Sequence, residues 1–142
     1  MSTFNKMLKI KLQLNSKLPA QKWKQSKNQS TETINLKYYN TCLLTGKVND
    51  IIVVDIDVAD NGIEEFNNYI KEFGEPKTIK QHSPSGGMHY FFKYTSSNPD
   101  DMYLIECYLK NKAKYRNAGL DIRSNGGYIV LAPSSIDGKN TH

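Results

Sequence analysis

The chain has 142 residues, which is enough for a hydrophobic core of its own, and we expect one domain over residues 1–142. Its net charge of +5 suits a nucleic-acid partner without requiring one. No apolar run reaches the roughly 20 residues that span a bilayer, and the N-terminus lacks a continuous apolar signal core. We therefore expect an intracellular protein with no membrane partner.

Apolar periodicity and turn residues predict a mixed α/β (α+β) sheet with helices packed on it. Strands are expected at residues 9–14, 41–44, 51–56, 78–81, 89–93, 120–123 and 128–131. Helices are expected at 32–39 and 61–73 and are favoured in the ambiguous segment 100–114, while 17–30 is expected to be a polar loop anchored by Trp23. The helix at 61–73 has five apolar residues at helical spacing, which should face inward: Ile63, Phe66, Tyr69, Ile70 and Phe73.

Two aspartates, Asp55 and Asp57, end the apolar strand expected at 51–56. Side chains two apart in a strand project to the same side, so these carboxylates should lie together. Carboxylates that close raise each other's pKa unless a cation lies between them, and Mg²⁺ prefers such hard oxygen ligands. A D-x-D at a strand end also occurs at ordinary turns, so by itself it does not identify a metal site.

The segment of residues 83–89, Ser-Pro-Ser-Gly-Gly-Met-His, predicts a tight turn that leads into a strand. The backbone of Gly86 and Gly87 can approach a ligand closely, and exposed N–H groups in such a turn can bind an anion. His89, at the start of the strand, could then hydrogen-bond a phosphate oxygen. The alternative is an ordinary hairpin turn with an incidental histidine.

Residues 119–133 predict two short strands joined by the turn Asn125-Gly126, which is a strong hairpin signal. Asp121 and Arg123 should share one face. They are either a surface ion pair of little energetic consequence or a metal ligand beside a phosphate clamp. The apolar residues of this segment should fill the core: Leu120, Ile122, Ile129 and Leu131.

The segment before this one carries lysines at alternate positions, Lys110, Lys112 and Lys114. They are either a basic stripe that holds a nucleic-acid backbone or a solvated surface. Cys107 and Cys42 are isolated in the sequence and form no zinc-binding motif, so we expect no zinc.

Three motifs together resemble the N-terminal Prim-Pol domain of bifunctional DNA primase/polymerases, in the archaeo-eukaryotic primase superfamily. They are Val54-Asp55-Ile56-Asp57, Ser85-Gly86-Gly87-Met88-His89 and Leu120-Asp121, in the order and spacing of that family. The resemblance covers roughly residues 10–138. Abundant lysine and asparagine, typical of AT-rich genomes, favour a viral or mobile-element member, which would act in the host cytoplasm or in a replication factory.

The resemblance implies an RRM-like catalytic core and template-directed nucleotidyl transfer during DNA replication. The implied substrates are an NTP or dNTP on a single-stranded DNA template, with Mg²⁺ or Mn²⁺ at a two-metal site. The catalytic set would be Asp55, Asp57, His89 and Asp121, of which the three aspartates hold the metals. Nucleotide-binding residues would be Ser85, Gly86, Gly87, His89 and Arg123.

This sequence departs from the family where relatives continue into a further strand and often into a superfamily 3 helicase. We therefore expect a domain truncated at its C-terminus, with a helicase as a candidate partner. Two alternatives stay open: a metal-dependent nuclease that uses the same carboxylates, and a non-catalytic nucleic-acid or nucleotide-binding module. The absence of an H-x-H pair argues against a relaxase-like nuclease.

Overall fold

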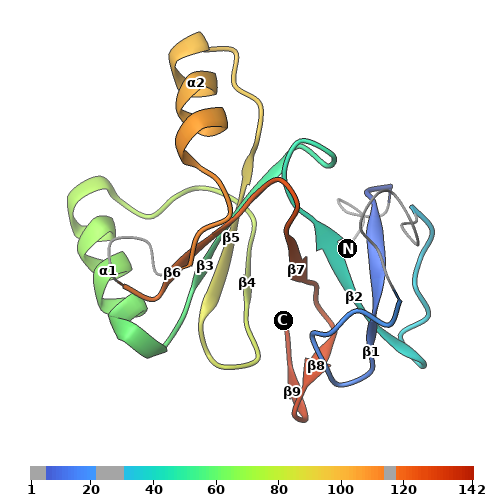
Figure 1. Cartoon of the computed structure of the whole chain (residues 1–142). Helices are drawn as coiled ribbons and strands as arrows, with labels where there is room; N and C mark the ends of the chain where they lie inside the picture. Colours follow the sequence, from blue (N-terminus) through green and yellow to red (C-terminus); the bar gives the residue numbers. More distant parts are fainter. Residues whose placement is uncertain (1–5, 22–30, 114–117) are drawn as a thin grey trace.

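The computed structural model describes residues 6–21, 31–113 and 118–142, which form two antiparallel sheets, a short two-stranded pair and two α-helices (Figure 1). The strands are β1 (Lys9–Gln13), β2 (Tyr39–Leu44), β3 (Ile51–Ile56), β4 (Lys80–His82), β5 (Met88–Lys93), β6 (Leu120–Arg123), β7 (Tyr128–Val130), β8 (Ser135–Ile136) and β9 (Lys139–Asn140). The helices are η2 (Ala59–Asn61, a 3₁₀ turn), α1 (Gly62–Phe73) and α2 (Pro99–Tyr108). The predicted α+β class is confirmed.

The four-stranded sheet has the order β4-β5-β3-β6, and the three-stranded sheet has the order β1-β2-β7. In the four-stranded sheet the chain runs strand–helix–strand–strand–helix–strand with its first strand, β3, in the interior, which is the split βαβ arrangement expected of an RRM-like core. Every pairing between these strands is antiparallel. Sequence periodicity reports which face is buried but not which direction the neighbouring strand runs.

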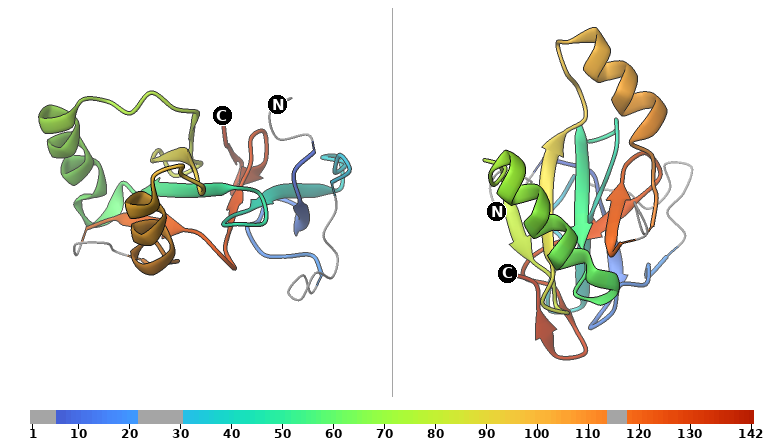
Figure 2. Two further views of the ribbon diagram at one scale, coloured as in Figure 1. Left: turned by 90° about the horizontal axis from the view of Figure 1, so that it is seen from above. Right: turned by 90° about the vertical axis from the view of Figure 1, so that its left-hand side faces the viewer.

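The interior strand β3 is buried on both faces, as its apolar run predicts. On one face, Ile52 and Ile122 form a core with Tyr94, against which side chains of α2 pack. On the other face, Val53 packs in a second core with Leu43 of the three-stranded sheet. The two sheets therefore pack directly against each other, and no helix lies between them (Figure 2).

Helix α1 confirms the predicted element but not its predicted burial. Phe66 is partly buried, with its ring 4.9 Å from that of Tyr90 in β5, and Ile70 is also partly buried. In contrast, Ile63, Tyr69 and Phe73 are exposed, Phe73 by 66%. The apolar stripe on the helix is wider than the strip that contacts the sheet, so burial of all five residues was a wrong prediction. None of the described helices has the length and apolar character needed to cross a membrane.

The helix predicted at 32–39 is absent from the structure. The side chain of Asn35 accepts a hydrogen bond from the Lys37 N–H at 3.0 Å, and its carbonyl accepts from Tyr38 and Tyr39. Local side-chain capture of this kind competes with helix formation, and the chain enters β2 directly at Tyr39. Trp23 and most of the expected loop at 17–30 lie outside the described residues. The helix favoured at 100–114 is present as α2, but it ends at Tyr108.

The predicted hairpin of β6 with β7 is wrong, although both strands exist. β6 pairs with β3, and β7 pairs with β2 in the other sheet. The intervening turn is held by outside contacts: the Thr45 hydroxyl donates to the Ser124 carbonyl at 2.6 Å, and the Lys47 N–H donates to the Asn125 side chain at 2.7 Å. An Asn-Gly turn can join two strands that pair with each other or two strands of different sheets. Here it joins strands of different sheets.

Candidate active site

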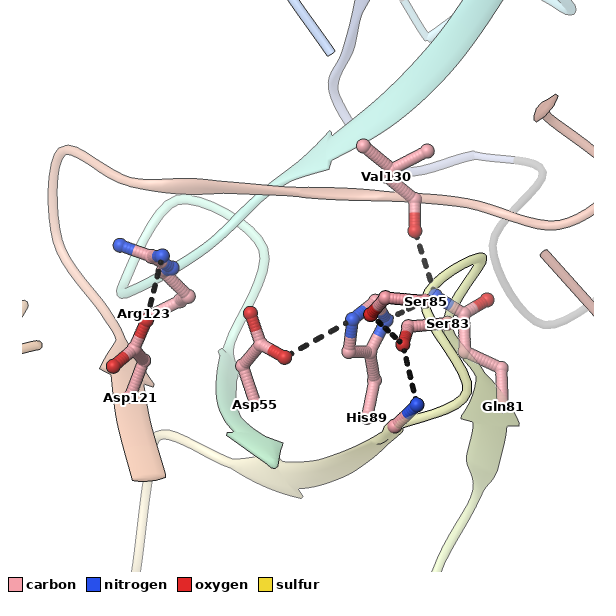
Figure 3. Close-up of polar contacts among 9 residues, drawn as sticks. Asp55, Gln81, Ser83, Ser85, His89, Asp121, Arg123 and Val130 are labelled. Atoms are coloured by element: carbon pink, nitrogen blue, oxygen red, sulfur yellow. Dashed lines mark hydrogen bonds and ion pairs between the residues drawn. The ribbon is translucent and has the colours of Figure 1, made fainter. Parts of the chain in front are cut away.

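A row of three polar residues crosses the four-stranded sheet on one face. Asp55 of β3 lies directly opposite His89 of β5 on one side and directly opposite Asp121 of β6 on the other. Residues opposite each other on adjacent strands project to the same face, with their Cβ atoms about 5 Å apart. The register therefore brings together two of the predicted metal ligands and the predicted catalytic histidine (Figure 3).

Two of the carboxylates in and beside this row have a nearby partner. The Nε2 atom of His89 lies 3.3 Å from an Asp55 oxygen, and both side chains are largely buried, at 6% and 15% exposure. The Arg123 guanidinium lies 3.2 Å from an Asp121 oxygen. The predicted contact of Asp121 with Arg123 on one face is thus present, and the arginine remains about one-third exposed.

Asp57 lies just past the end of β3 and has no side-chain hydrogen-bond partner among the residues that the structure describes. Burial raises the pKa of the Asp57 carboxyl, and the nearby carboxylates of Asp55 and Asp121 raise it further, while Arg123 and His89 oppose the shift. Its backbone N–H donates to the Gly119 carbonyl at 2.7 Å. The surroundings of Asp57 therefore favour the binding of a proton or a cation to its carboxylate.

The glycine-rich turn between β4 and β5 packs tightly against the end of β3. A Cβ atom on Gly87 would come within 2.1 Å of the Ile56 carbonyl oxygen, so only glycine fits there. Both glycine N–H groups are used inside the turn: Gly86 donates to the Ser83 carbonyl at 3.1 Å, and Gly87 donates to the Ser83 hydroxyl at 3.0 Å. The predicted backbone contacts of Gly86 and Gly87 with phosphate would have to replace these bonds.

The serine hydroxyls of the same turn face a pocket of about 570 Å³ that lies between the two sheets. Five of the predicted site residues line it: Asp55, Asp57, Ser85, His89 and Arg123. Asp121, Gly86 and Gly87 are not among its lining residues. The pocket thus has carboxylates and a guanidinium within one concave space.

Sequence reasoning missed several residues that also line this pocket: Lys17, Ser83, Asn111 and Tyr128. The Tyr128 hydroxyl donates to the Lys17 carbonyl at 3.0 Å, and the Asn111 side chain accepts from the Ser124 N–H at 2.7 Å. These contacts join segments that are far apart in the chain, so no local pattern marks them. Of the predicted basic stripe, Lys110 and Lys112 do not line the pocket, and Lys114 lies outside the described residues.

The donor set fits Mg²⁺ or Mn²⁺ as an open half-site. Within residues 6–21, 31–113 and 118–142, no three His, Cys, Asp or Glu side chains form a ready-made metal cluster. Mg²⁺ is nevertheless usually held by one or two carboxylates together with waters and substrate phosphates, rather than by a closed protein cage. Asp55 and Asp57 provide two such carboxylates at the pocket wall.

The fold and the site define an α+β domain with an RRM-like sheet and a pocket lined by carboxylates and a guanidinium. The family of bifunctional DNA primase/polymerase N-terminal domains, Prim-Pol, matches residues 9–142. The chain therefore belongs to the Prim-Pol family, which confirms the resemblance read from its three motifs. A search of curated proteins found no match.

Proposed function

We propose that this domain catalyses template-directed nucleotidyl transfer from an NTP or dNTP and depends on divalent metal ions. The observation that carries the proposal is the cross-strand row of His89, Asp55 and Asp121, with Asp57 beside it. Carboxylates directly opposite each other repel and gain nothing for the fold. Asp55 and Asp57 line the pocket and Asp121 lies directly beside Asp55, an arrangement that a bound cation would stabilise.

The proposed metal ligands are Asp55, Asp57 and Asp121. Bound Mg²⁺ or Mn²⁺ would supply activation of the attacking 3′-hydroxyl and stabilisation of the leaving pyrophosphate oxygens. The carboxylates would hold the cations, and their negative charge would disfavour a triphosphate that carries no metal ion. Since Asp121 is paired with Arg123, its participation requires that Arg123 turn toward the substrate.

The proposed triphosphate contacts are Arg123, His89 and the hydroxyls of Ser83 and Ser85. The planar fork of an arginine matches two phosphate oxygens, and Arg123 is exposed enough to reach them. The two serine hydroxyls share one hydrogen bond at 3.2 Å, so one of them keeps its proton free to donate to a phosphate group, and the other could donate only by giving up that bond. With both glycine N–H groups occupied, these hydroxyls are the better donors in the turn.

The test is to incubate the protein with a single-stranded DNA template, labelled nucleotides and Mg²⁺ or Mn²⁺. New oligonucleotide supports the proposal, degraded template indicates a nuclease, and binding without chemistry indicates a non-catalytic module. Asp55→Asn should remove the activity. Glu72→Gln, an exposed change on α1 away from the pocket, is the matched control and should retain it.

A further inference from the structure

A buried glutamine, Gln81, contacts the histidine of the active site from the side away from the pocket. Gln81 in β4 lies directly opposite His89 in β5, and each residue is only 4% exposed. The Gln81 side-chain nitrogen Nε2 lies 2.7 Å from His89 Nδ1 (Figure 3). His89 is thus held through both ring nitrogens, by Gln81 on one side and by Asp55 on the other.

Two backbone groups of the other sheet fix which way the Gln81 amide points. Nε2 donates to the Val130 carbonyl at 2.6 Å, and Oε1 accepts from the Ala132 N–H at 3.1 Å. A carbonyl can only accept and an N–H can only donate, so turning the amide over would bring two acceptors together and two donors together. The NH₂ group therefore faces both Val130 and His89.

The orientation of the amide determines the tautomer of the imidazole. Because Nε2 of Gln81 can only donate, Nδ1 of His89 must accept, and the proton of the neutral ring lies on its Nε2. That N–H points toward Asp55 and the pocket. We infer that Gln81 is a positioning residue that keeps His89 in the Nε2–H tautomer, so that its one N–H, which faces Asp55 in the free protein, can turn to a nucleotide phosphate when Asp55 binds a metal ion. The role of the phosphate rests on the proposed function.

The same three contacts couple the two walls of the pocket. Gln81 belongs to the four-stranded sheet, whereas Val130 belongs to the three-stranded sheet and Ala132 follows it directly. The glutamine therefore sets the position of His89 relative to both sheets. A residue that only filled space at this site would need none of these polar contacts.

The tautomer can be measured directly by ¹⁵N NMR of the imidazoles in the metal-free protein. The chain has three histidines, His82, His89 and His142, and a His89→Ala spectrum assigns the relevant signals. In its neutral form, wild-type His89 should carry its proton on Nε2. A proton found mainly on Nδ1 would overturn the inference, and this result needs no Gln81 variant to fold.

Two variants test whether Gln81 is the cause. Gln81→Met keeps the shape and removes the donor, so the Nε2–H form should lose its dominance. Gln81→Glu offers an acceptor instead, so the proton should move to Nδ1. An unchanged His89 tautomer in either folded variant would show that Gln81 does not set it.

Binding of MgATP provides a second readout that a structural role would not reproduce. Gln81→Met and His89→Ala should each weaken MgATP binding more than tenfold, and the double variant should be no weaker than His89→Ala alone, because the glutamine acts through the histidine. Additive losses would overturn the positioning role. A domain that sets the tautomer but makes no oligonucleotide would refute the proposed function and leave the positioning role standing.

Discussion

The two faces of the four-stranded sheet are made by the same strands but differ in polarity. On the face toward α2, Ile52 and Ile122 are buried in an apolar core. On the face toward the pocket, Asp55, His89 and Asp121 form a polar row. Apolar burial stabilises the native state, whereas opposed carboxylates oppose it. Substitutions on the apolar face should therefore reduce stability, whereas substitutions in the polar row should reduce activity and leave stability largely unchanged.

The largest effect on nucleotide incorporation is expected from a change at Asp55. Asp55→Asn should reduce nucleotide incorporation about a thousandfold, equivalent to about 4 kcal/mol of activation free energy, because it removes the charge of a proposed metal ligand. Its urea denaturation curve should stay close to that of the wild type. Incorporation near the wild-type rate in a folded Asp55→Asn protein would refute the metal assignment.

The opposite face should show the reverse pattern. Ile52→Ala removes a side chain that is 3% exposed and should lower the free energy of unfolding by about 2–5 kcal/mol. Urea denaturation measures this loss. At urea concentrations below the unfolding transition, the folded Ile52→Ala protein should bind MgATP as tightly as the wild type does. A selective loss of MgATP binding in the folded fraction would show that the two faces are not independent.

His89→Ala should weaken nucleotide binding more than template binding. The loss of one hydrogen bond to a charged phosphate is expected to cost about 1.5–3 kcal/mol. Titrations with MgATP and with a labelled single-stranded oligonucleotide compare the two effects, and His82→Ala is the matched control. Unchanged nucleotide affinity with lost DNA affinity would reverse the assignment of His89.

Arg123→Lys should have a smaller effect, chiefly on apparent nucleotide affinity. The lysine keeps the charge but loses the two-pronged contact, for a loss of about 1 kcal/mol that a higher nucleotide concentration should partly rescue. Steady-state kinetics separate this from Asp121→Asn, whose defect should persist at saturating nucleotide. If both variants are folded and fully active, the third motif belongs to the scaffold.

The smallest effect concerns the charge on Asp57. Since the folded-state pKa of Asp57 is above the ordinary value of 3.8, the native state binds more protons than the unfolded state just above that value, and its stability falls as pH rises through this window. At neutral pH, Asp57→Asn should therefore be slightly more stable than the wild type, because it removes the buried charge.

Urea denaturation at pH 7 and at a pH below 3.8 measures the Asp57 effect, and the difference between the two proteins should vanish at the acidic pH. Saturating Mg²⁺ should stabilise the wild type and not the variant, which would narrow or reverse the difference at neutral pH. A wild type that Mg²⁺ does not stabilise would argue that these carboxylates bind no metal without a nucleotide.

Local sequence determined most of the elements and the family. The run before Asp55 predicts β3, the spacing at 61–73 predicts α1, and the Ser-Pro-Ser-Gly-Gly turn predicts the β4–β5 hairpin. The three motifs also identified the Prim-Pol domain. These features are readable because periodicity, turn residues and motif spacing all act over a few residues.

The tertiary structure alone decided how the elements meet. It placed Asp121 opposite Asp55 by pairing β6 with β3 instead of β7, and it brought Gln81 to His89 and Val130. It also left Ile63, Tyr69 and Phe73 of α1 exposed. Strand partners and register depend on packing between residues that are far apart in the chain, and a pattern of period two is equally compatible with several partners. The chemistry of this site therefore depends on side chains that the sequence names, but the contacts among them are set by the fold.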